Sequence, residues 1–316
     1  MNCHDLTDAE INMILERFDK TDKELQRQVV IRLTADRAIL IDALQKISQE
    51  AKTAGRTWIG CTKVSEGCQN CYAENLMATR YGRVRWGIDG TRSRTKTWND
   101  PKRWNRQAER DGIKRKVFCA SLADVFEDRG ELMPWREDLF KLIDDCPWLH
   151  WLLLTKRPEN IRRMWPDANE RENVWLGTSI SNQRNADECI DRLLDARFLS
   201  PVLFLSLEPQ IGFVDLRPWL DPDPLIHWVI VGGESAQGHP ARRFDVEWAV
   251  DAVCQCRPPF SNVPVFIKQM GSNPYMYGKP YPLKDSHGGD MAEWPETIRV
   301  RECPEIFYAQ NKLQTT

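Results

Sequence analysis

Three cysteines stand close together in the segment GCTKVSEGCQNCYAE, residues 60–74. Cys61, Cys68 and Cys71 follow the spacing C-x6-C-x2-C. Thiolates are soft ligands that select iron–sulfur clusters, zinc or copper(I). Structural zinc takes four protein ligands, so it would need a distant fourth one such as Cys119. Three thiolates on a four-iron cluster would instead leave one iron open to an external ligand. The spacing therefore predicts a [4Fe–4S] cluster on these three cysteines, with zinc as the alternative.

Polar and charged side chains follow most of the apolar runs that we expect to be strands. They are Ser121 and Asp124, Thr155-Lys156-Arg157, Thr178 and Ser179, Ser206 and Glu208, Gly232-Gly233-Glu234-Ser235, and Lys268 and Gln269. In parallel α/β folds functional groups collect at the carboxyl ends of the strands, where loops converge on one pocket. We therefore expect these residues to share a site. The candidates for binding a cofactor are Ser121, Asp124, Lys156, Gly232, Gly233 and Glu234.

The Gly232-Gly233-Glu234 run closes a strongly apolar segment. Two glycines allow backbone amides to approach a ligand closely, and a carboxylate can accept hydrogen bonds from an ammonium group or hydroxyls. The structural alternative is an ordinary turn between a strand and a helix.

Ser121 and Asp124 could receive the amino group of a cofactor, or they could cap the next helix. Lys156 and Arg157 suit a carboxylate or a phosphate, the arginine through its planar fork. Pro158 beside them is also typical of a helix start. Glu208, and Lys268 with Gln269, are similar candidates whose alternative is an ion pair between neighbouring strand ends.

Seven short apolar runs predict strands, and helical stretches separate most of them. The strands are expected at Thr57–Gly60, Val117–Ser121, Trp151–Thr155, Val174–Ser179, Val202–Leu207, Trp228–Gly232 and Val263–Lys268. The helices are expected at Ala73–Arg80, Trp135–Asp144, Ala186–Leu194 and Asp245–Val253. Because the strands are continuously apolar, both faces of the sheet should be buried. This pattern predicts an α/β protein built as a partial or full parallel (β/α) barrel, over residues 56–271.

The two ends of the chain have a different character from the predicted barrel. Apolar residues recur at helical spacing from residue 5 to about residue 52, which predicts a helical appendage over residues 1–55. From Ser272 to the end, residues 272–316, the sequence is rich in Pro, Gly and Tyr, and we expect an irregular tail.

A basic and aromatic insertion is expected over residues 80–110. It holds many arginines and lysines, interleaved with Tyr81, Trp86, Trp98 and Trp104. Cations pair with phosphates and aromatic faces stack on bases, so this segment is the best nucleic-acid signal in the chain. The alternative is that the tryptophans pack the insertion onto the barrel while the arginines stay solvated.

Composition limits the partners that the chain can have. The formal net charge is −2, from 44 basic and 46 acidic residues, so no global field attracts a polyanion. No run of about 18 apolar residues occurs, and we expect no membrane span. The first residues lack the basic start and apolar stretch of a signal peptide, so a cytoplasmic protein is expected.

The cysteine segment resembles the cluster loop of radical S-adenosylmethionine enzymes. It differs from their commonest spacing, C-x3-C-x2-C, in its longer first gap, and Asn70 stands where that loop has an aromatic residue. From about Trp58 to Gly271 the chain resembles the phage protein family Gp37/Gp68, which is similar to radical enzymes of the spore photoproduct lyase type. The other matching stretches are KRWNR, VFCASLADVFED, WLLLTKRPENI, NVWLGTSISNQ, FLSLEPQIG, WVIVGGESAQG and VPVFIKQMG.

The resemblance implies a barrel of the radical enzyme type, with a [4Fe–4S] cluster and S-adenosylmethionine as cofactors and an electron donor such as a flavodoxin. It implies an isomerase or lyase that rearranges a modified thymine, for example one with an amino-acid substituent, in the thymidine hypermodification of phage DNA. Such an enzyme would work in the host cytoplasm. Two alternatives stay open: a zinc-dependent DNA-binding module, and a radical enzyme acting on a peptide or small metabolite.

Overall fold

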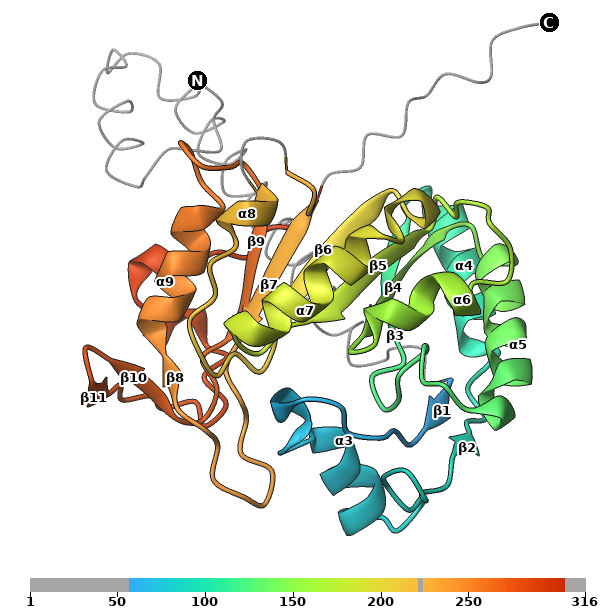
Figure 1. Cartoon of the computed structure of the whole chain (residues 1–316), viewed down its shortest axis with the longest axis horizontal. Coiled ribbons are helices and arrows are strands. Elements are labelled where there is room, and N and C mark those ends of the chain that lie inside the picture. The colour runs from blue at the N-terminus through green and yellow to red at the C-terminus, as the bar shows by residue number, and fades with distance from the viewer. Residues whose placement is uncertain (1–56, 221–223, 305–316) are drawn as a thin grey trace, which may run out of the picture. The chain divides into compact units, whose positions relative to one another are not determined.

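The computed structural model describes residues 57–220 and 224–304 (Figure 1). The chain divides into two units, Met1–Lys52 and Thr53–Thr316, and all of the described residues belong to the second. The expected helical appendage over residues 1–55 lies outside the described residues. In the part of the chain described here, no helix has the length and apolar character needed to cross a bilayer.

Six parallel strands form the central sheet, which curls into half of a barrel (Figure 1). They are β3 (Arg115–Cys119), β4 (Leu149–Thr155), β5 (Val174–Ser179), β6 (Val202–Leu207), β7 (Trp228–Gly232) and β9 (Val265–Gln269). Their order in the sheet is β3-β4-β5-β6-β7-β9, so strands adjacent in the sheet also follow one another along the chain. This confirms the predicted partial parallel (β/α) barrel.

Helices connect the strands and cover one face of the sheet (Figure 1). They are α4 (Asp100–Asp111), α5 (Met133–Asp144), α6 (Ile161–Met164), α7 (Gln183–Leu194), α8 (Arg217–Leu220) and α9 (Val246–Gln255). Helix α7 begins at Asn182, whose side chain accepts a hydrogen bond from the Asn185 backbone amide. Helix α4 ends at Gly112, which takes the left-handed conformation that glycine adopts at little cost.

The apolar core lies on both faces of the sheet. Leu153 and Leu205 belong to the cluster between the sheet and the helices, which is also the larger one. Their neighbours Leu152 and Phe204 point to the opposite face and form a second cluster with Trp175 and other aromatic side chains. Successive residues of a strand point to opposite faces, so burial of both faces explains why these strands are continuously apolar.

The first predicted strand does not join the parallel sheet. Strand β1 (Trp58–Ile59) pairs antiparallel with β2 (Ser93–Arg94), in a separate two-stranded ribbon. Gly60 follows with φ of +110°, a value that L side chains rarely adopt, and turns the chain into the cysteine loop. Its amide donates to the Leu122 carbonyl at 3.0 Å, which fixes the turn against the loop after β3. The expectation that this segment starts the barrel is therefore wrong.

After the cysteines, the expected helix Ala73–Arg80 divides into two forms. A single turn of α-helix, α3 (Tyr72–Glu74), continues as a π-helical turn over Asn75–Arg80. The amide of Tyr81 bonds to the carbonyl of Leu76, five residues earlier, as in a π-helix. Such turns are rare and are frequent at functional sites.

The segment after Ser272 is more ordered than its composition predicts. Strand β10 (Pro274–Met276) pairs parallel with β8 (Phe244–Asp245) and antiparallel with β11 (Lys279–Pro280). Trp294 is fully buried, and its indole donates to the Gly288 carbonyl at 2.9 Å. An anchored tryptophan of this kind buries a large apolar area, so residues 272–304 pack onto the barrel.

Candidate functional site

A cavity of about 380 Å³ lies at the carboxyl ends of the parallel strands, against the cysteine loop. It is lined by nearly every candidate that the sequence singles out: Cys61, Cys68, Cys71, Ser121, Asp124, Thr155, Lys156, Arg157, Ser179, Ser206, Glu208, Gly233, Glu234, Ser235, Lys268 and Gln269. Gly232 is the exception among the cofactor candidates, since it does not line the cavity and faces the Glu208 side chain. The fold thus gathers residues separated by up to two hundred positions of chain around one space.

The cysteine loop packs tightly against the strand ends. Gly67 has no room for a side chain, because a Cβ there would stand 2.1 Å from the Ser181 hydroxyl. Cys68 follows at the end of a short 3-10 turn and is buried, while Cys61 and Cys71 are half-buried. The Ser65 hydroxyl lies 3.7 Å from the Cys68 sulfur. Backbone and side-chain contacts therefore fix the direction of the loop.

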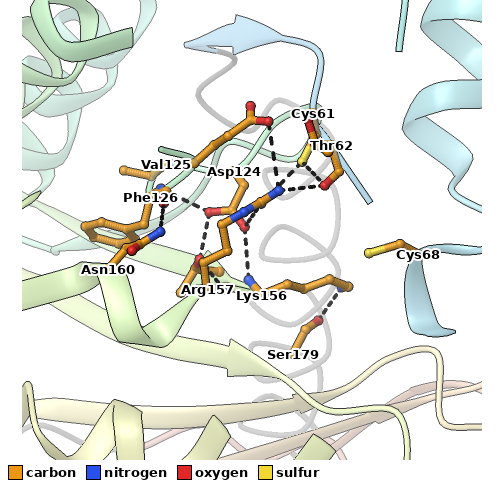
Figure 2. Close-up of polar contacts among 12 residues, drawn as sticks. Cys61, Thr62, Cys68, Asp124, Val125, Phe126, Lys156, Arg157, Asn160 and Ser179 are labelled. Atoms are coloured by element: carbon orange, nitrogen blue, oxygen red, sulfur yellow. Dashed lines mark hydrogen bonds and ion pairs between the residues drawn. The ribbon is translucent and has the colours of Figure 1, made fainter. Parts of the chain in front are cut away.

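Arg157 connects the end of β4 to the first cysteine (Figure 2). Its Nη1 donates to Cys61 Sγ at 3.6 Å and to Asp124 Oδ2 at 2.9 Å, and its Nη2 donates to the Thr62 carbonyl at 2.6 Å. Glu127 adds a longer ion pair at 3.9 Å. The charges of Asp124 and Cys61 raise the pKa of Arg157, although burial acts the other way and is the largest single influence. This side chain is therefore a fixed cation beside the cysteine loop.

Asp124 is fully engaged with the protein. Its carboxylate accepts four hydrogen bonds: from the Phe126 amide at 3.0 Å, the Thr155 hydroxyl at 2.7 Å, the Lys156 amide at 3.0 Å and Arg157 at 2.9 Å. The sequence predicts that Asp124 receives the amino group of a cofactor. In the structure its observed role is to orient the residues that follow β4, which leaves little acceptor capacity for a ligand.

Lys156 is the cation of the cavity that has no acidic partner. Its ammonium group donates to the Ser179 hydroxyl at 2.7 Å. Within 57–220 and 224–304, no carboxylate stands within ion-pair distance of it. Figure 2 shows the side chain running from the strand end toward Ser179, on the side of Cys68. A lysine in this position can accept an anionic group of a ligand.

Glu234 holds the cysteine loop rather than facing an open space. Its carboxylate accepts from the Asn70 side chain at 2.9 Å and from Arg242 Nη2 at 2.6 Å. Arg242 also donates to the Glu66 carbonyl at 2.8 Å. Burial raises the pKa of Glu234, but the bonds from Arg242 and Asn70 outweigh it and leave the pKa below its usual value. Glu234 is thus an ionised clamp between the end of β7 and the loop.

The neighbouring strand ends are also paired among themselves. Lys268 is ion-paired with Glu208, as the alternative interpretation of these residues expected. Gln269 donates to the Gly233 carbonyl at 3.0 Å. A Cβ on Gly233 would stand 2.2 Å from the Met270 carbonyl oxygen, so glycine is required there for packing against the end of β9. These contacts form the far wall of the cavity.

The three thiols differ in how readily they ionise. Burial, with the charge of Asp124, raises the pKa of Cys61 to about 12, and burial raises that of Cys71. Burial also acts to raise the pKa of Cys68, but the charge of Lys156 and hydrogen bonds at residues 64 and 65 together lower it. The thiolate is the form that binds a metal. Cys68 is therefore the thiol best prepared to ionise in the protein itself.

Among the described residues, no three His, Cys, Asp or Glu side chains converge on a point where one metal ion could sit. Zinc would require ligands at about 2.0–2.3 Å from one ion. Cys119, the fourth thiol considered from the sequence, also lines the cavity, but complete burial raises its pKa to about 12. The thiols border a shared space without closing on an ion, which fits a bulky group held from one side better than a closed zinc site.

Comparison with known proteins gives one match. Residues 46–293 match the family described as protein of unknown function (DUF5131). The chain belongs to this family. No curated protein and no solved structure matches the chain.

The part of the chain shared with the DUF5131 family contains the whole candidate site. It covers the cysteine loop, the six strands and all of the cavity-lining residues. Three residues of this DUF5131 site were missed from the sequence: Asn70, Arg242 and Arg92, whose buried guanidinium bonds to Glu127 and to the Thr62 hydroxyl at 2.9 Å. Only Asn70 stood beside a recognised motif. The other two are distant in sequence from their partners and carry no local signal.

Proposed function

We propose that this chain is a radical S-adenosylmethionine enzyme that holds a [4Fe–4S] cluster on Cys61, Cys68 and Cys71. The observation that carries the proposal is that these three thiols and the unpaired ammonium group of Lys156 border one cavity. That cavity lies at the carboxyl ends of a curled parallel sheet, where α/β enzymes place their chemistry. When bound, a reduced cluster supplies the electron that cleaves S-adenosylmethionine to a radical able to abstract hydrogen from a substrate.

The residues around the cavity divide the work of binding. Cys61, Cys68 and Cys71 would hold three irons, and the hydrogen bond from Arg157 to Cys61 would keep that sulfur in place. Lys156 suits the carboxylate of S-adenosylmethionine, because an ammonium group without an acidic partner gains most from a bound anion.

The remaining walls position the ligands and limit the entry of water. Phe118, Leu154 and Trp86 supply the apolar lining of the cavity, and Ser121 and Ser206 supply hydroxyl groups. Replacing water with fixed dipoles strengthens electrostatic contacts inside such a site and protects a reactive species from side reactions.

We propose a nucleobase as the substrate, with a rearrangement or lyase step on a modified thymine in the hypermodification of phage DNA. The resemblance to the Gp37/Gp68 family, and through it to radical enzymes of the spore photoproduct lyase type, supports this choice. The reaction needs an electron donor such as a flavodoxin, and the reduced cluster requires a reducing compartment such as the host cytoplasm.

The test begins with protein purified without air. It should be brown, contain about four irons per chain and give the paramagnetic resonance spectrum of a reduced [4Fe–4S] cluster. Added S-adenosylmethionine and dithionite should yield 5′-deoxyadenosine. The triple variant Cys61→Ala, Cys68→Ala, Cys71→Ala should lose the iron, whereas Cys254→Ala, at an exposed cysteine outside the site, should keep it. Colourless protein with one zinc per chain would sink the cluster and favour the zinc-dependent module.

The substrate class is tested separately. DNA that contains amino-acid-substituted thymidine should give an altered nucleoside when incubated with the reduced enzyme and S-adenosylmethionine. Deoxyadenosine formation that responds only to a peptide or small metabolite would assign the chain to the other class of radical enzymes.

A further inference from the structure

The basic and aromatic insertion divides into two parts with different roles. In its second part the charged groups are used within the fold. Arg92 is buried against Glu127, and Arg94 pairs with Asp138 at 2.8 Å and lies 4.1 Å from the Trp98 ring centre. Trp98 and Trp104 pack against the core. Here the structural alternative holds, and these residues are not a surface for a partner.

The first part is exposed and leaves its positive charges uncompensated. Tyr81 is 53% exposed, and the guanidinium carbons of Arg80 and Arg83 stand 5.6 and 5.7 Å from its ring centre. Arg85 is exposed as well. In the described part of the chain none of these three arginines forms an ion pair with a carboxylate. Asp89 is the one acidic residue in this stretch.

This exposed stretch is physically continuous with the cavity. Val84 is buried beneath it, next to Met77 of the π-helical turn. Further along, Trp86 lines the cavity, and the Gly87 amide donates to the Cys61 carbonyl at 3.1 Å. The Arg83 amide is fixed by the Met77 carbonyl at 2.8 Å. The stretch is therefore a defined surface that begins at the cavity wall and runs outward.

We infer that Arg80, Tyr81, Arg83 and Arg85 form a docking surface for single-stranded nucleic acid, which leads one nucleotide past Trp86 into the cavity. The inference rests on the proposed function in that the cavity is the site of the chemistry, and it specifies a polymer rather than a free nucleotide as substrate. Guanidinium groups pair with phosphates, and an exposed tyrosine presents a face on which a base can stack. A duplex hides its base faces, so an aromatic platform favours a single strand.

The test measures binding by fluorescence anisotropy with a labelled single-stranded oligonucleotide of mixed sequence. The iron-loaded protein should bind the single strand more tightly than the duplex of the same length. Tyr81→Ala should weaken binding by about 5- to 150-fold, the range expected for loss of one stacked base, and Tyr81→Phe should retain it. Arg80→Gln with Arg83→Gln should reduce the slope of log affinity against log salt by about 1.4.

The matched control is Arg103→Gln with Arg106→Gln, an equal loss of charge from the exposed face of α4 in the same insertion. It should leave the affinity nearly unchanged, and circular dichroism should show that all of the variants are folded. An equal loss in the control, equal binding of duplex, or displacement by polyglutamate as effective as by the oligonucleotide would overturn the inference. Normal iron content and deoxyadenosine formation alongside absent strand binding would overturn the docking surface alone. Strand binding by protein that takes up no iron would support the surface and overturn the proposed function instead.

Discussion

The guanidinium of Arg157 lies 3.6 Å from the sulfur of Cys61 and, through the same nitrogen, 2.9 Å from the carboxylate of Asp124. All three groups are buried or half-buried. One cation therefore satisfies a buried acid that is part of the framework and also contacts a proposed cluster ligand. The stability of the fold and the position of this cysteine are coupled through a single side chain.

The first prediction concerns this coupling. Arg157→Met should destabilise the protein by about 3–5 kcal/mol, because it leaves the buried charge of Asp124 without its partner. Arg157→Lys keeps the charge but cannot bond to Asp124, Thr62 and Cys61 at once, and should bind less iron than the wild type. Urea unfolding and iron analysis measure the two effects. Arg163→Met, which breaks the exposed pair with Asp128, is the control and should cost less than about 1 kcal/mol.

A second prediction addresses the close approach of the cysteine loop to the strand ends. Gly67→Ala places a methyl group 2.1 Å from the Ser181 hydroxyl oxygen, so the loop or that side chain must move. We expect iron content to fall, and to recover in part when Ser181→Ala is added. Gly130→Ala, where no atom lies within 4 Å of the added Cβ, should bind iron as the wild type does. Equal iron in all three variants would show that the position of Gly67 is irrelevant to the site.

The unpaired charge of Lys156 gives the third prediction. Lys156→Met should weaken binding of S-adenosylmethionine by about 10- to 150-fold, the range for loss of a hydrogen bond to a charged group, while iron content stays the same. Equilibrium dialysis on the iron-loaded protein measures the affinity. Lys102→Met removes a charge that is paired with Asp145 outside the cavity, at 3.5 Å, and serves as the control. Unchanged affinity in Lys156→Met would remove this residue from the cofactor site.

His150 makes folding stability depend on pH. Burial, assisted by the charges of Lys114 and Lys116, lowers its pKa from 6.5 to about 4. The unfolded chain then binds a proton more readily than the native protein, so the contribution of His150 is complete above pH 6.5 and is lost as the pH falls toward 4. By pH 5 the loss is about 2 kcal/mol.

Urea unfolding at pH 7.5 and at pH 5 measures this loss. In His150→Phe the difference between the two pH values should shrink by about 2 kcal/mol. The part that remains is expected to include His227, whose pKa is lowered in the same direction by burial. An unchanged pH dependence in His150→Phe would contradict the assignment.

Local sequence signals predict the elements of the sheet well. The bounds predicted for β5, β6 and β7 agree with the structure, because a continuous apolar run flanked by polar residues identifies a strand buried on both faces. The same signals fail for Trp58–Ile59, which is apolar and follows the strand pattern but pairs with Ser93–Arg94. Strand pairing depends on distant partners, and periodicity says nothing about them.

The sequence by itself determined that three thiols stand within eleven residues and that polar groups end the strands of a parallel α/β sheet, since spacing and periodicity are properties of neighbouring residues. Only the tertiary structure decided what those groups contact. Glu234 and Asn70 are 164 positions apart, and Arg157 and Cys61 are 96 apart. The curl of the sheet brings these ends around one cavity, leaves Lys156 without an acidic partner and commits Asp124 to the framework, because hydrogen bonding inside a packed site is settled by geometry that no local pattern encodes.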